Sequence, residues 1–278
     1  MRDFYAPSSS MPLDQADGLR RLFAASRRHV IPLVANPHVA FSGVVLDRLA
    51  AVLADNSTGA GRQVLVVDAA ASSPMPRELA DVDLAACVER IAPRVCYLAA
   101  RGLPASYVDT RGSAAGFIDA VQQAAPQAEV LLLHADGSDL ARLLKHRAAR
   151  PVLIGADHPE SIKHAYAGAK LLAGRCGLMT FDLLLAAAPH SPRGASIPSS
   201  LAGCIENFLG ALLRHSALID PAGDADGPAS TELARLLAEQ LRLDEGPAPS
   251  IRAAPLPHTV AGRHAAHAHP NLNRTAFL

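Results

Sequence analysis

The strongest constraint on the fold is a regular alternation of short, continuously apolar runs with longer helical patterns. A run that is apolar at every position is typical of a parallel strand buried on both faces. Such runs are expected as strands at residues 29–34, 63–68, 95–100, 129–134, 151–155 and 178–188. Helical patterns lie at residues 44–54, 114–125, 138–147, 161–174, 201–215 and 231–243. The order predicts a doubly wound α/β fold, with a mostly parallel sheet and helices on both faces.

The periodicity also predicts where the folded domain begins and ends. Residues 27–245 are expected to form the α/β domain, preceded by an arm of residues 1–26 with a short helix over 14–23. Residues 246–278 are rich in Ala, Pro and His without periodicity, which predicts a disordered tail. Four tail histidines are interpreted as incidental rather than as a metal site: His258, His264, His267 and His269.

Composition narrows the class of protein. The formal net charge is +0 and aromatic residues make up 4% of the chain, so neither electrostatics nor base stacking favours a nucleic-acid partner. Four cysteines lie far apart without a CxxC pair and are interpreted as reduced core thiols: Cys87, Cys96, Cys176 and Cys204. The N-terminus lacks the apolar core of a secretory signal, and no apolar run approaches the roughly 18 residues of a membrane span. We therefore expect a cytoplasmic protein.

The segment between the first strand and the first core helix has the strand–loop–helix order of a phosphate-binding loop without its chemistry. Such loops use glycines that expose converging N–H groups, a Lys for the phosphates and a Ser or Thr for magnesium. Here Pro37 removes an N–H donor, and Val39 and Phe41 are bulky where the backbone should tolerate positive φ. The scaffold is present and the phosphate contacts are missing.

Polar residues end several predicted strands or begin the loops that follow: Asn36, His38, Asp68, His134, Asp136, Asp157 and His158. Ligands of open parallel sheets bind outside the carboxyl ends of the strands, so a replacement site could use His38, Asp68, His134 and Asp157. The favoured interpretation is that these side chains cap helices and satisfy loop backbone, because none has metal-ligand spacing. No catalytic residue is assigned, since no GxSxG elbow or activated cysteine is present.

Three further motifs carry a resemblance. Residues 14–20 read DQADGLR, residues 64–70 read VLVVDAA, and residues 159–166 read PESIKHAY. The first is similar to the DQAxxLR signature, the second to a strand ending in Asp-x-Asp, and the third to a PEPTSIxDAY segment. In this order the chain resembles the MinD/ParA family of deviant-Walker ATPases, in particular its flagellar-number regulators. The resemblance extends to about Leu243 and implies a P-loop NTPase-like fold.

The departures from the family pattern fall in the nucleotide site. The family loop GKGGVGKT lies over residues 36–43, placing Asn36 and His38 at glycines, Pro37 and Ser42 at the lysines, and Gly43 at the magnesium-binding hydroxyl. Asp68 keeps the first acid of Asp-x-Asp, whereas Ala70 replaces the second. His134 replaces a magnesium-linked acid, and the base-reading Asn is missing near Ala186. The resemblance therefore implies a pseudo-ATPase without cofactor; the alternative is an active ATPase that uses ATP and magnesium through a remodelled loop.

The resemblance also implies a partner, a signal-recognition-type flagellar GTPase whose activity sets flagellar number or placement. The residues expected to engage it are Asp14, Gln15, Ala16, Gly18, Leu19 and Arg20. Flagellar basal-body components are further candidate partners, and a partner could recruit the chain to the cell pole or membrane. The helix over residues 231–243 is interpreted as core-packing rather than membrane-binding, because its polar face is mainly acidic. A small-molecule-binding α/β protein is the third hypothesis.

Overall fold

The computed structural model describes residues 28–55, 61–81, 83–223 and 229–243. The chain divides into a unit of residues 1–246 and a unit of residues 247–278, and every described residue belongs to the first. The predicted arm and tail lie outside the described residues. Within the described part, no helix is both long and apolar enough to cross a membrane.

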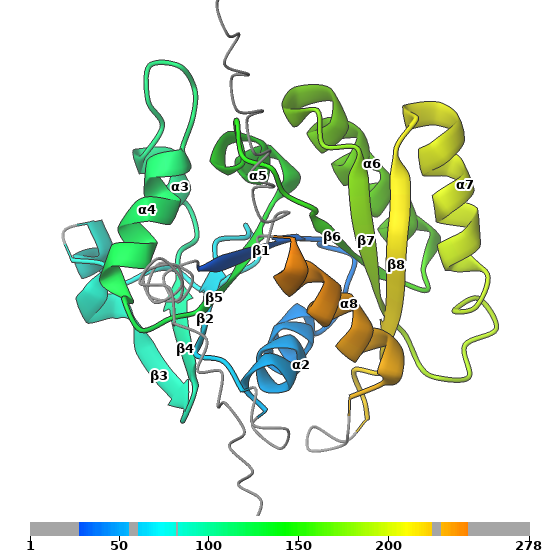
Figure 1. Ribbon diagram of the computed structural model, residues 1–278, viewed down its shortest axis with the longest axis horizontal. Helices are drawn as coiled ribbons and strands as arrows, with labels where there is room; N and C mark the ends of the chain where they lie inside the picture. Colours follow the sequence, from blue (N-terminus) through cyan, green and yellow to red (C-terminus); the bar gives the residue numbers. More distant parts are fainter. Residues whose placement is uncertain (1–27, 56–60, 82, 224–228, 244–278) are drawn as a thin grey trace, which may run out of the picture. The chain divides into compact units, whose positions relative to one another are not determined.

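The core of the domain is an eight-stranded sheet with the order β3-β4-β2-β5-β1-β6-β7-β8 (Figure 1). The strands are β1 (His29–Val34), β2 (Val64–Asp68), β3 (Glu89–Ala92), β4 (Val95–Ala99), β5 (Val130–Ala135), β6 (Val152–Ala156), β7 (Thr180–Ala186) and β8 (Leu212–Ile219). All neighbours pair in parallel except β3 and β4, which are antiparallel. The predicted doubly wound, mostly parallel sheet is confirmed.

Helices cover both faces of the sheet. One face carries α3 (Leu103–Ser106), α4 (Ala115–Ala124), α5 (Gly137–Leu143), α6 (Pro159–Cys176) and α7 (Ile197–Leu209). The other face carries α2 (Ser42–Ala54) and α8 (Thr231–Arg242) (Figure 1). Leucines of both helices pack on the strands from this side. Two short 3-10 turns, η1 (Glu78–Asp81) and η2 (Ala85–Cys87), lie between β2 and β3. The sheet is therefore buried on both faces, as its apolar strands require.

Close helix–sheet packing depends on one glycine. A Cβ atom at Gly168 of α6 would lie 2.9 Å from Val34 Cγ1 of β1, a separation that real Cβ contacts do not adopt. The missing side chain lets α6 approach β1 directly. This approach places the first turn of α6 beside the loop that follows β1, where the candidate site lies.

The differences from the sequence prediction include α7 with β8, the edge strand β3, and α5. The helix expected over residues 201–215 ends at Leu209, where Gly210 adopts a left-handed conformation (φ 63°), and the chain then forms edge strand β8. Strand β3 was not predicted, because it is exposed and polar at the other edge of the sheet. The helix expected over residues 138–147 is the shorter α5, and His146 takes a positive φ beyond its end.

All four cysteines are free thiols, and their burial differs from the prediction. Cys87 is buried, whereas Cys96 and Cys176 are half-buried and Cys204 is exposed. The expectation that all four would be core residues was therefore wrong for Cys204, which lies on the outer surface of α7.

Candidate functional site

Asn36 is a structural tie in the loop between β1 and α2. Its side chain is buried, and Nδ2 donates to the carbonyl of Ile154 (2.8 Å) and to the carbonyl and Oγ of Ser161 (2.8 and 3.0 Å). Asn36 Oδ1 accepts from the backbone N–H of His38 at 3.1 Å. One amide therefore joins the end of β1 to the end of β6 and the first turn of α6. Asn36, which stands at the first glycine position of the loop pattern, therefore stabilises the fold.

The next residues use their backbone within the loop. The N–H of Val39 donates to the carbonyl of Asn36 (3.1 Å), and the Val39 side chain is buried in the core under α2. Pro37 has no N–H, and His38 is exposed with its ring edge-on to His164, the centroids 5.9 Å apart. Pro37 offers no N–H, and the N–H groups of His38 and Val39 both donate to Asn36, so this stretch cannot converge on an anion as a phosphate loop does.

Phe41 holds a left-handed backbone (φ 62°, ψ 38°) immediately before α2. Its carbonyl accepts from the N–H groups of Val44 and Val45, so the helix begins there, while its side chain is 71% exposed. This conformation costs a non-glycine residue roughly 1–2 kcal/mol. The loop thus keeps the positive φ of a glycine position with a phenylalanine in it, and the aromatic ring does not fill the crevice at the strand ends.

The start of α2 keeps one feature of an anion site. Within the described part of the chain, the N–H groups of Ala40, Phe41, Ser42 and Gly43 donate to no acceptor. Free N–H groups at a helix N-terminus favour negative charge. Pro37 and Ser42 stand at the two signature lysine positions, so no lysine side chain accompanies these N–H groups.

Asp68 and His134 form a buried pair at the carboxyl edge of the sheet. They lie directly opposite each other in the register of β2 and β5, and His134 Nδ1 is 2.7 Å from Asp68 Oδ1. The Ser73 hydroxyl also donates to Oδ1, and the Tyr97 hydroxyl donates to Oδ2 at 3.1 Å. The carboxylate is thus surrounded by three side-chain partners. His134 Nε2 is buried and has no partner in the described structure.

Electrostatics keep this carboxylate ionised. Burial alone raises the pKa of Asp68, but the hydrogen bonds and charge of His134, with the hydroxyls of Ser73 and Tyr97, outweigh burial and lower the pKa below the usual value of an aspartate. Burial and the Asp68 charge raise the pKa of Tyr97, so its hydroxyl stays protonated as a donor. The acid that the family resemblance places at a magnesium-dependent site is here satisfied by its own chain.

We expect Asp68→Asn to destabilise the protein in a pH-dependent way. A carboxylate with a lowered pKa stabilises the fold above its unfolded pKa, and the stabilisation is lost as pH falls through the folded value. The difference in unfolding free energy between wild type and Asp68→Asn should therefore shrink from pH 7 toward pH 3, measured by urea unfolding. The control is Asp119→Asn, at an exposed surface ion pair. It should change the free energy of unfolding by less than about 1 kcal/mol at either pH. A difference that grows as the pH falls would contradict the assignment.

The other strand-end residues act separately. Asp136 is the N-cap residue of α5 and accepts from the N–H of Ala71 (2.9 Å), and Asp157 accepts from the Ser191 hydroxyl (2.7 Å). His158 is the N-cap of α6 and accepts from the N–H of Glu160 at 3.3 Å. Of the predicted set, the structure joins Asp68 to His134 and uses these three in caps and loop contacts. Within the described residues, no group of three or more His, Cys, Asp or Glu is placed to hold a metal ion.

Sequence reasoning missed three residues that complete the site. Ser161 carries the contacts of Asn36, and its Oγ also accepts from the N–H of Ala156 (2.8 Å). Ser73 and Tyr97 complete the shell of Asp68. Of the three, Tyr97 could have been identified from the sequence, because a tyrosine inside a short buried strand needs a partner for its hydroxyl. The predicted partner-binding residues 14–20 lie outside the described residues.

Comparison with known proteins identifies the fold. No protein-family model and no curated protein matches the sequence. The MinC:MinD cell division protein complex of Aquifex aeolicus matches with a TM-score of 0.50 and 13% identity, over 76% of this chain and 96% of that chain. A protein assigned to plasmid partition in Borrelia burgdorferi B31, bound to AMPPNP, matches with a TM-score of 0.52 and 8% identity, over 78% of this chain and 99% of that chain. At these identities the likeness shows a shared P-loop NTPase-like fold.

Proposed function

We propose that this chain is a pseudo-ATPase that regulates flagellar number or placement through a signal-recognition-type flagellar GTPase. The observation that carries the first half is the state of the loop and its surroundings. The side-chain amide of Asn36 donates to backbone carbonyls of β6 and α6. The carboxylate of Asp68 is hydrogen-bonded to His134, Ser73 and Tyr97. A charge-assisted phosphate contact is worth roughly 1.5–3 kcal/mol, so losing two lysines removes most nucleotide affinity.

The second half of the proposal rests on the sequence of the arm. Residues 14–20 carry Gln15 and Arg20 in the pattern that resembles the GTPase-stimulating signature, next to the apolar Leu19, Leu22 and Phe23. A fold that has lost its phosphate contacts and kept this arm is suited to act on a partner's nucleotide rather than on its own. The proposed role of Gln15 and Arg20 is to act at the GTPase site of that partner.

Hydrolysis of GTP by the flagellar GTPase tests this role. We expect a peptide of residues 1–25 and the full-length chain to accelerate hydrolysis, because the motif supplies polar groups to the partner's site. Gln15→Ala and Arg20→Ala should each abolish the acceleration, whereas the neighbouring Arg21→Ala, outside the motif, should retain it. No acceleration and no binding by peptide or full-length chain would overturn the proposal.

Two other functions are tied to specific observations. The four free N–H groups at the start of α2 favour the alternative of an ATPase with a remodelled loop. The unpartnered Nε2 of His134, oriented by Asp68, favours a small-molecule site at the strand ends. Both remain second to the regulatory role, because the loop lacks lysines and His134 is buried.

A further inference from the structure

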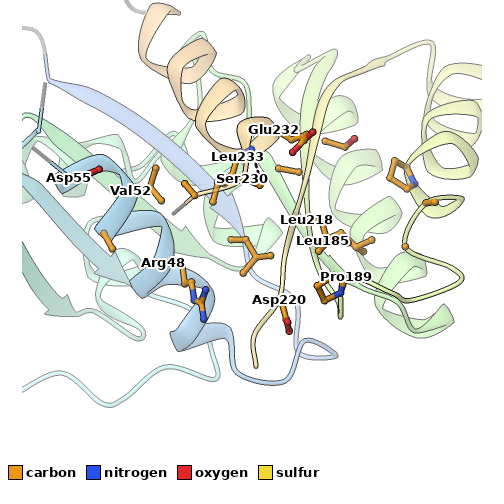
Figure 2. A pocket seen from close by; sticks show the side chains of 18 of the residues that line it. Arg48, Val52, Asp55, Leu185, Pro189, Leu218, Asp220, Ser230, Glu232 and Leu233 are labelled. Carbon is orange, nitrogen blue, oxygen red and sulfur yellow. Dashed lines mark hydrogen bonds between the residues drawn. The ribbon is translucent and has the colours of Figure 1, made fainter. Parts of the chain in front are cut away.

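A groove of about 980 Å³ lies along the outer edge of β8, at one end of the strand order (Figure 2). Residues 216–220, at the end of this strand, line it without a break. Val52 of α2 and Leu233 of α8 contribute a wall on one face of the sheet, and Pro198 of α7 contributes a wall on the other. None of residues 36–43 lines the groove, so it is separate from the loop between β1 and α2.

The backbone of β8 turns hydrogen-bonding groups into this groove. The carbonyl of Ile219 accepts from the N–H of Ala187 at 3.0 Å, so the backbone of Ile219 faces β7. Successive residues of a strand turn their N–H and C=O groups to opposite edges, so Ser216 and Leu218 turn theirs away from β7. Among the described residues, no strand pairs with β8 on that side. Backbone donors and acceptors in such a row recognise an extended chain.

The edge of β8 also lacks the features that usually prevent strand addition. Soluble proteins protect edge strands by charged side chains, proline or short length. The opposite edge strand β3 has such protection, because it has four residues and carries Glu89 and Arg90. β8 has eight residues, and residues 216–219 include neither a charged residue nor a proline. The contrast indicates that the edge of β8 can accept a further strand.

The side chains of the groove define the chemistry of that strand. Three of the four charged residues that line it in the described structure are acidic: Asp55, Asp220 and Glu232. The fourth, Arg48, donates to the backbone carbonyl of Gly223, so part of its donor capacity is used within the chain. The groove therefore favours basic residues on its occupant. Its apolar walls favour apolar side chains next to them.

We propose that β8 binds an extended segment of a partner protein, which adds a strand to this edge of the sheet. The segment pairs with the backbone of Ser216 and Leu218, and its side chains alternate between the wall of α2 and α8 and the wall of α7. Its basic residues lie near Asp220 and Glu232. The site belongs to the described domain, so the proposal is independent of the role of the arm at the GTPase.

Hydrogen exchange of the full-length protein, resolved by NMR for each amide, tests the backbone pairing. In the free protein, the amides of Ser216 and Leu218 should exchange about tenfold faster than those of Ala217 and Ile219, which face β7. Saturation with the peptide KVTVTVK, an alternating sequence between two lysines, should slow the Ser216 and Leu218 amides about tenfold. Amides of β3 should not change.

Two results of this experiment would overturn the proposal. The first is protection of the Ser216 and Leu218 amides without peptide, because a second copy or another segment of the chain would then pair with the edge. The second is a peptide-saturated protein in which these two amides exchange as fast as before.

Fluorescence anisotropy of the labelled peptide tests the chemistry of the groove. A version N-methylated at every amide between its lysines should bind about tenfold more weakly, because it has lost the backbone donors. The peptide EVTVTVE should also bind about tenfold more weakly, because its charges oppose those of the groove. Glu232→Lys should weaken KVTVTVK binding about threefold, whereas Glu160→Lys on α6, outside the groove, should not. Equal binding of the three peptides, or no binding of any, would overturn the proposal.

Discussion

Arg150→Met should destabilise the protein by about 3–5 kcal/mol, because it leaves Asp182 buried without its cation. Asp182 is fully buried in β7, and Arg150 Nε lies 2.9 Å from its Oδ2, within ion-pair distance though without hydrogen-bond alignment. Gln240 of α8 donates to the same oxygen at 2.7 Å, so the pair also anchors the last helix. Burial raises the pKa of Asp182, partly offset by Arg150, so in the variant the carboxyl either stays charged without its cation or takes up a proton.

Urea unfolding at neutral pH measures this loss. The matched control is Arg147→Met, which removes a surface partner of Asp119 at 2.7 Å and should cost only about 0–1 kcal/mol. Adding Asp182→Asn to Arg150→Met should recover part of the stability, since the unpaired charge is gone. A loss for Arg150→Met no larger than that of the surface control would contradict the buried-pair account.

Asn36→Ala should cost about 2–4 kcal/mol, because it removes the four hydrogen bonds that this buried side-chain amide makes. The carbonyls of Ile154 and Ser161 lose their donor, and the N–H of His38 loses its acceptor. The residue therefore contributes to the fold at the position where a phosphate loop would place a glycine. Chemical unfolding of the full-length chain measures the effect.

Ser42→Ala is the control for this position. Ser42 lies in the same loop pattern at the place of the second lysine, and its side chain makes no hydrogen bond in the described structure. Its replacement should change stability by less than about 0.5 kcal/mol. If Asn36→Ala were as mild as Ser42→Ala, the amide would not be the tie between β1, β6 and α6.

The buried strands were predictable because a parallel strand covered on both faces must be apolar throughout. Residues 129–134 and 151–155 were expected as strands and form β5 and β6 within one residue at each end. Edge strand β8 was missed because its apolar residues continue the pattern of α7 without a polar break. The signal that could have separated them is Gly210, a residue that ends helices in the left-handed conformation.

The candidate site was predictable only in part. Asp68 and His134 could be brought together from the rule that parallel strands end at one edge of the sheet. The contacts of Asn36 could not be predicted, because Ile154 and Ser161 lie 118 and 125 residues away in the sequence. Their approach to Asn36 depends on how α6 packs on the sheet. The positive φ of Phe41 was also hidden, since sequence rules assign that conformation to glycine.

Calorimetric titration of the full-length protein with ATP and magnesium tests the central claim that this fold has lost its nucleotide function. The account predicts a Kd weaker than about 1 mM, equivalent to less than about 4 kcal/mol of binding free energy. The titration is repeated with Asn36→Ala to separate a folding role from a binding role. A micromolar Kd, about 8 kcal/mol, would contradict the account and support an active ATPase with a remodelled loop.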